Sequence, residues 1–105
     1  LPDLVPMILA GTNRIEIIKR SVCKHFGISR AALESKSRRA AIVRARQISA
    51  YLSRKHTRYS FPEIGRRLGG RDHTTILHAF HKISALLDSD ESIAADVSRL
   101  EAEIL

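Results

Sequence analysis

The chain has 105 residues, of which 44% are hydrophobic and 28% are charged, and its formal net charge is +7. This composition predicts one folded domain with a modest core rather than a disordered protein. No apolar run approaches the length of a membrane span and no signal-peptide pattern opens the chain, so we expect a cytoplasmic protein. The single cysteine, Cys23, cannot form an internal disulfide, which is typical of a reducing compartment.

Charge is distributed unevenly along the chain. Residues 1–87 contain 17 Lys and Arg against 5 Asp and Glu, whereas residues 88–105 contain 1 against 6. A strongly basic body indicates a polyanionic partner such as nucleic acid, and an acidic end is not expected to contact that partner.

Helical periodicity dominates, and no stretch alternates with the period of a strand. We therefore predict an all-α fold of about six helices. The segment 1–12 carries two prolines and an aspartate within an apolar run, so we expect a linker or a severed end before a domain at 13–105. The expected helices run from about 14 to 26 with Thr12 or Asn13 as cap, from 30 to 34 after Ser29, from 41 to 56, from 61 to 68, from 73 to 87, and from about 91 to the end.

The stretch 60–73 has the signals of a helix-turn-helix. Ser60 and Glu63 form the sequence pattern of a capping box, with the hydroxyl accepting from the Glu63 amide and the carboxylate reaching back. Gly69 and Gly70 can end this short helix with positive φ, and Asp72 is placed to cap the next one. Two helices joined by such a turn can place the second helix in the major groove of DNA.

The second helix begins with polar residues. His73, Thr74 and Thr75 precede its first core residue, Ile76, so at least two of the three should project outward. Threonine and histidine can contact base edges or phosphates, and a helix N-terminus favours a phosphate. The alternative is that Asp72 and Thr75 only cap the helix while His73 is an ordinary surface residue.

These residues resemble the C-terminal DNA-binding domain of the bacterial replication initiator DnaA. The resemblance rests on the run from Gly69 to Ala79 (GGRDHTTILHA), on Ser60 to Gly65 (SFPEIG) and on Arg44 to Gln47 (RARQ). It implies a helix-turn-helix of the Trp-repressor type that binds double-stranded DNA at initiator boxes of the replication origin. Ala45 stands where that family often has proline, a change that a helix tolerates.

The resemblance also implies roles for individual residues. Base contacts in the major groove are expected from Asp72, His73 and Thr74, with help from Pro62 and Thr75. Arg38 is expected to enter the adjacent minor groove, where A·T-rich DNA has an enhanced negative potential, although Arg39 could take this place. Phosphate contacts are expected from Arg39, Arg44, Arg46, Gln47, Arg54 and Arg71.

Other functions are less well supported. We expect no enzyme and no metal site, because His78 and His81 have no accompanying cysteine or carboxylate pair. No phosphate-binding loop of the type GxxxxGK[ST] occurs, so the chain should hold no cofactor, and ATP would bind only to an ATPase module outside it. A free-standing transcription or replication regulator, a basic protein-interaction module and an RNA-binding role remain alternatives. We expect a monomer that meets other replication proteins on DNA at the nucleoid.

Overall fold

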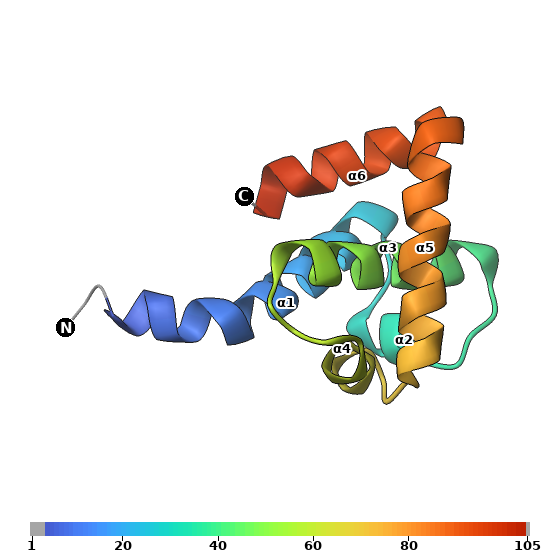
Figure 1. Cartoon of the computed structure of the whole chain (residues 1–105). Coiled ribbons are helices and arrows are strands. Elements are labelled where there is room, and N and C mark those ends of the chain that lie inside the picture. The colour runs from blue at the N-terminus through green and yellow to red at the C-terminus, as the bar shows by residue number, and fades with distance from the viewer. Residues whose placement is uncertain (1–3, 105) are drawn as a thin grey trace.

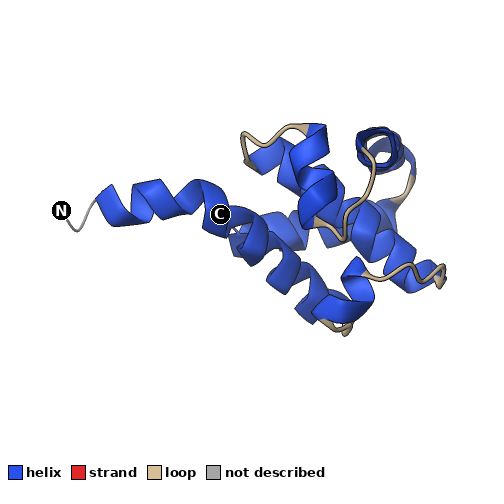
Figure 2. Ribbon diagram, turned by 90° about the horizontal axis from the view of Figure 1, so that it is seen from below, coloured by secondary structure: helices blue, strands red, loops and turns tan. Residues whose placement is uncertain are grey.

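A computed structural model describes residues 4–104 of the chain, and the side chains of residues 14–104. The described residues form six helices without strands (Figures 1 and 2), which confirms the predicted fold class. The helices are α1 (Leu4–Phe26), α2 (Arg30–Glu34), α3 (Ala40–His56), α4 (Phe61–Arg67), α5 (His73–Ser89) and α6 (Glu91–Ile104). None of them is long and apolar enough to cross a membrane.

The N-terminus of α1 differs from the sequence-based expectation. A helix starting near Arg14 was predicted, but α1 starts at Leu4, so Thr12 and Asn13 lie inside it and do not cap it. Pro6 does not break the helix, because backbone nitrogens of a first turn have no intrahelical partner. Figures 1 and 2 show this first part of α1 extending away from the other helices. Residues 1–3 lie outside the described part, and the expected linker 1–12 is helical from residue 4 on.

The core lies around α3, which packs against α1 on one side and α5 on another. Apolar side chains at helical spacing on each helix meet there, because that spacing places them on one face. The apolar residues that are completely buried are Ile15, Ile18, Val22, Leu33, Ala45, Ile48, Leu52, Ile64, Leu68, Ile83 and Leu100. Tyr51 of α3 stacks on Phe80 of α5 at a ring-centroid distance of 5.3 Å, so both act as packing residues.

The acidic last helix folds back over the domain. The apolar stripe predicted for it, Ile93, Val97, Leu100 and Ile104, is buried against α1, α3 and α5. Its carboxylates also face the basic body. Asp96 Oδ1 lies 2.8 Å from His25 Nε2, and Glu101 Oε2 lies 2.7 Å from Lys55 Nζ. The helix therefore covers its own domain.

Candidate nucleic-acid interface

The corner between α4 and α5 has the geometry expected of a helix-turn-helix. The hydroxyl of Ser60 accepts from the Glu63 amide at 3.3 Å and begins α4 as predicted. Gly69 has φ +85°, a conformation that side chains with a Cβ rarely adopt, and it ends the helix. The Arg71 amide then donates to the Gly65 carbonyl at 2.7 Å. A Cβ at Gly65 would lie 2.0 Å from the Arg71 carbonyl oxygen, so only glycine permits this close approach.

One part of the predicted capping box is wrong. The Glu63 carboxylate does not return to the start of its helix but binds the two arginines that follow on the same face. Its Oε1 accepts from Arg67 Nε at 2.9 Å, and its Oε2 accepts from Arg66 Nε at 2.9 Å. Because these charged hydrogen bonds stabilise the carboxylate, the pKa of Glu63 lies below its ordinary value. The positive charge of Arg66 and Arg67 is therefore partly neutralised within α4.

The tip of α5 is free. Asp72, His73, Thr74 and Thr75 are all exposed, and about 60% of the His73 side-chain surface and 64% of that of Asp72 are accessible. Asp72 occupies the cap position, but its carboxylate accepts no hydrogen bond from the described amides of the first turn. Its backbone carbonyl accepts from the Thr75 amide instead, at 3.1 Å. The predicted side-chain cap is therefore wrong. The carboxylate lies beside the His73 ring instead, with Asp72 Oδ1 3.1 Å from His73 Nδ1, and both groups are open to solvent.

The loop between α2 and α3 presents the two arginines expected at the minor groove. Two serines give the loop its shape, because the Ser35 hydroxyl accepts from the Ser37 amide at 3.2 Å and the Ser37 hydroxyl accepts from the Arg39 amide at 3.3 Å. Such local side-chain bonds favour a turn over a helix. Arg38 and Arg39 are exposed on this loop.

The arginines expected at phosphates are placed in two ways. Arg44 and Arg54 lie toward the surface, where Arg44 Nη1 donates to Gln47 Oε1 at 3.1 Å and Arg54 Nη1 donates to the Tyr59 carbonyl at 3.1 Å. Arg46 and Arg71, both half-buried, instead donate to backbone carbonyls at the end of α2 and in the loop after it. Burial lowers the pKa of both guanidinium groups, and the charge of Arg71 lowers that of Arg46 further.

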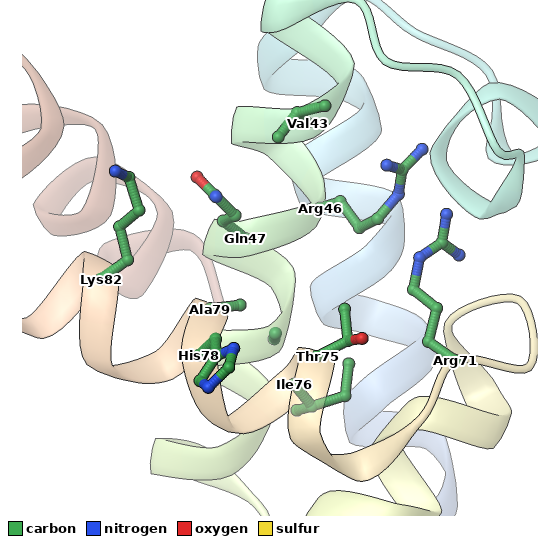
Figure 3. Close-up of a pocket in the computed structure, with 10 residues that line it drawn as sticks. Val43, Arg46, Gln47, Arg71, Thr75, Ile76, His78, Ala79 and Lys82 are labelled. Atoms are coloured by element: carbon green, nitrogen blue, oxygen red, sulfur yellow. The ribbon is translucent and has the colours of Figure 1, made fainter.

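A groove of about 280 Å³ lies between α3 and α5 beside the tip of α5 (Figure 3). Its polar lining comes from Arg46, Gln47, Arg71, Thr75, His78 and Lys82. His78 and Lys82 had not been predicted as site residues. The spacing of Thr75, His78 and Lys82 along α5 could have indicated them, because residues three, four and seven apart share one helix face. Pro62, expected at a base, is exposed in the first turn of α4.

A buried lysine of α1 binds the end of α4, next to the corner between α4 and α5. Lys19 of α1 is only 2% exposed, and its Nζ donates to the Arg67 carbonyl at the end of α4 at 2.6 Å. It also lies 3.3 Å from the Glu34 carboxylate of α2. A buried charge requires such partners, and here they join three helices. Sequence periodicity gave no signal for this role, because nothing in the sequence distinguishes Lys19 from Arg20 and Lys24, which are exposed on the same helix.

Residues 15–83 match the family model of the bacterial dnaA protein helix-turn-helix. The chain is 51% identical over 88 residues to the chromosomal replication initiator protein DnaA of Rhizobium meliloti (strain 1021), an alignment that covers 84% of this chain and 18% of that protein. It is 50% identical over 101 residues to the protein of the same name from Agrobacterium fabrum, with coverage of 96% and 21%.

The chain spans about a fifth of the length of these relatives. The matched segment holds the whole corner from Ser60 to the free tip of α5, as well as the loop before α3. The chain therefore belongs to the bacterial DnaA family, and it corresponds to the C-terminal helix-turn-helix domain of that family.

Proposed function

We propose that this domain binds double-stranded DNA sequence-specifically at DnaA-box sites of a replication origin, and so serves the initiation and regulation of chromosomal replication. One observation carries the proposal. The tip of α5 presents Asp72, His73, Thr74 and Thr75 to solvent, free of the core and of the helix cap. Such a tip at the start of the second helix of a helix-turn-helix is the part that enters the major groove.

The chemistry of the tip suits base reading. The Asp72 carboxylate, open to solvent beside the His73 ring, can accept from a cytosine amino group, and the His73 ring can donate to a purine N7. Threonine offers both a hydroxyl and a methyl group, so Thr74 and Thr75 can contact thymine methyls. The unpaired amides at the start of α5 add an attraction for the nearby phosphate.

The basic surface around the tip would hold the two strands. We assign Arg38 or Arg39 to the minor groove next to the site, because both lie exposed on the loop before α3. The groove between α3 and α5 would follow the phosphate backbone, with Gln47 and Lys82 on its walls. The acidic helix α6 lies at the other end of α5 from the tip (Figure 1), which keeps its charge away from the DNA.

A binding titration against salt tests this proposal. The domain should bind a duplex with a DnaA box more tightly than a scrambled duplex of the same composition by a factor of about 10³ or more. The logarithm of the affinity should fall linearly with the logarithm of the salt concentration, with a slope of about −0.9 for each phosphate contacted. Equal affinity for both duplexes at every salt concentration would contradict sequence-specific binding.

The substitution His73→Ala tests the role of the tip. It should weaken binding to the box by about 1–3 kcal/mol and leave binding to the scrambled duplex almost unchanged, because only a base contact is lost. Thermal unfolding should shift little, since the exposed His73 ring lies outside the core. If the variant kept its full preference for the box, His73 would not read bases.

A further inference from the structure

Arg46 of α3 is joined to the end of α2 and to the loop after it. Its Nε donates to the Leu33 carbonyl at 3.0 Å, its Nη2 to the Ser35 carbonyl at 2.7 Å, and its Nη1 to the Ser37 carbonyl at 3.2 Å. The last carbonyls of a helix have no partner within it and carry partial negative charge. One guanidinium thus satisfies three carbonyls over the segment 33–37.

Arg71, in the turn before α5, reaches the same place from the other side. Its Nη2 donates to the Ser35 carbonyl, which therefore accepts from both arginines, and its Nη1 donates to the Leu68 carbonyl. Figure 3 shows the two guanidinium groups at the same end of the groove. The turn also touches α2 directly, because a Cβ at Gly69 would lie 2.3 Å from the Glu34 carbonyl oxygen.

These contacts form a clamp, made of Arg46, Arg71 and the carbonyls of Leu33, Ser35 and Ser37. On one side of it lies the loop with Arg38 and Arg39, and on the other lies the turn that leads into the tip of α5. Two positive groups share one carbonyl at this point, an arrangement that several directed hydrogen bonds and the nearby negative charge of Glu34 stabilise.

We propose that Arg46 and Arg71 are positioning residues, which fix the minor-groove loop relative to the major-groove tip of α5, so that both grooves are read in one register. This inference rests on the proposed function and assigns these two arginines a role other than phosphate binding. A binding site must hold its contacting groups within about 0.5 Å of the productive geometry, and supporting hydrogen bonds provide that precision. Lysine keeps the charge but has no planar fork that could reach three carbonyls.

The binding test isolates reading of the minor groove. One A·T tract of the box is replaced by G·C pairs in one duplex and by inosine·cytosine pairs in another. These two duplexes present the same pattern in the major groove and differ in the minor groove by the guanine amino group. The unaltered domain should prefer the inosine duplex about tenfold, a ratio that corresponds to one misread base pair.

The variants Arg46→Lys and Arg71→Lys should bring this ratio close to one, as should alanine at both Arg38 and Arg39. Combining Arg46→Lys with alanine at both Arg38 and Arg39 should lower the ratio no further, because the clamp acts through the loop that carries these two arginines. Arg99→Lys, an exposed change on α6, is the matched control and should keep the ratio. A ratio unchanged in both clamp variants would overturn the inference, whereas lack of box preference in the unaltered domain would overturn the proposed function itself.

A second measurement needs no variant that might fail to fold. In nitrogen-15 NMR of the unaltered domain, the guanidinium protons of Arg46 and Arg71 should exchange slowly with water before DNA is added, and box DNA should change this exchange little. Those of Arg38 and Arg39 should exchange fast in the free protein and become protected on binding. Fast exchange of the Arg46 and Arg71 protons that slows only with DNA would show phosphate contacts and would overturn the inference.

Discussion

The two ends of α5 differ in whether their residues are exposed or packed against the rest of the domain. At its first turn, Asp72, His73 and Thr74 are exposed and support neither the core nor the helix cap. At its last turn, the chain reverses at Asp90, whose carboxylate accepts from the Ile93 amide at 3.2 Å, and α6 packs its apolar stripe against the domain. One end is therefore free to bind, and the other end holds the fold together.

The same division applies to charge. The loop that carries Arg38 and Arg39 leaves α2 near α4 and the tip of α5 and runs to the start of α3, whereas the acidic α6 lies at the opposite end of α5 (Figure 1). There Asp96 and Glu101 are paired with His25, Lys55 and His56. The charge asymmetry of the sequence thus becomes a separation in space. Binding and stability should then respond to different substitutions.

The largest expected effect is on stability, at the end of the molecule remote from the tip. Leu100→Ala removes a fully buried side chain of α6, so it should lower the free energy of unfolding by about 2–5 kcal/mol. Urea denaturation measures this, with the exposed Arg99→Ala as control, for which we expect a change within about 0.5 kcal/mol. The folded fraction should keep its preference for the box. Loss of that preference would show that the two ends of α5 are not independent.

The next largest effect is expected at the turn between α4 and α5. Gly69 and Gly70 both have positive φ, but a Cβ at Gly69 would clash with the Glu34 carbonyl oxygen at 2.3 Å, whereas a Cβ at Gly70 would meet nothing within 4 Å. Gly70→Ala should therefore cost only the backbone strain, about 1 kcal/mol. Gly69→Ala should cost more, about 2–3 kcal/mol, and should also move the turn away from the end of α2.

Comparison of Gly69→Ala with Gly70→Ala separates the cost of backbone strain from the effect of moving the turn away from α2. Chemical denaturation gives their stabilities, and binding to the box under fully folded conditions gives their function. We expect box affinity to fall in Gly69→Ala and to remain in Gly70→Ala. An equal loss of affinity in both variants would mean that the contact between the turn and α2 does not position the tip.

The features that the sequence predicted correctly are those with local causes. Ser60 as a cap, the end of α4 near Gly69 and the start of α5 at His73 each depend on residues only a few positions apart. The burial of Ile93, Val97, Leu100 and Ile104 followed from spacing alone, because one helix face must meet the core.

The features that it did not predict depend on contacts between distant residues or on competition between partners. Arg71 and Ser35 are 36 positions apart, and nothing in their neighbourhoods reveals that one binds the carbonyl of the other. Lys19 and Arg67 are 48 apart. Glu63 could have closed the capping box, but two arginines one turn later offered stronger, charged partners. The sequence does not distinguish an exposed arginine from one whose guanidinium group binds backbone carbonyls of the same protein.

The smallest expected effect concerns the pairing of α6 with the basic body, and it depends on pH. Partial burial opposes ionisation of Glu101, but hydrogen bonds from Lys55 and His56 outweigh this, so the pKa of Glu101 lies below its ordinary value. A carboxyl whose pKa is lowered by folding stabilises the protein at pH values above its unfolded pKa, about 4.3. That contribution is lost as the pH falls from there through the lowered pKa of the folded state.

Thermal unfolding at pH 7 and at steps below pH 5 measures this contribution. The unaltered domain should lose stability over that acidic range. Glu101→Gln should lose less stability over the same range, because the variant has no carboxylate at this position and so lacks its stabilising contribution even at pH 7. Glu103→Gln removes one charge from an exposed position of the same helix and should behave like the unaltered domain. Equal slopes for all three proteins would show that the ion pair of α6 does not stabilise the fold, and that its apolar stripe alone holds this end of α5.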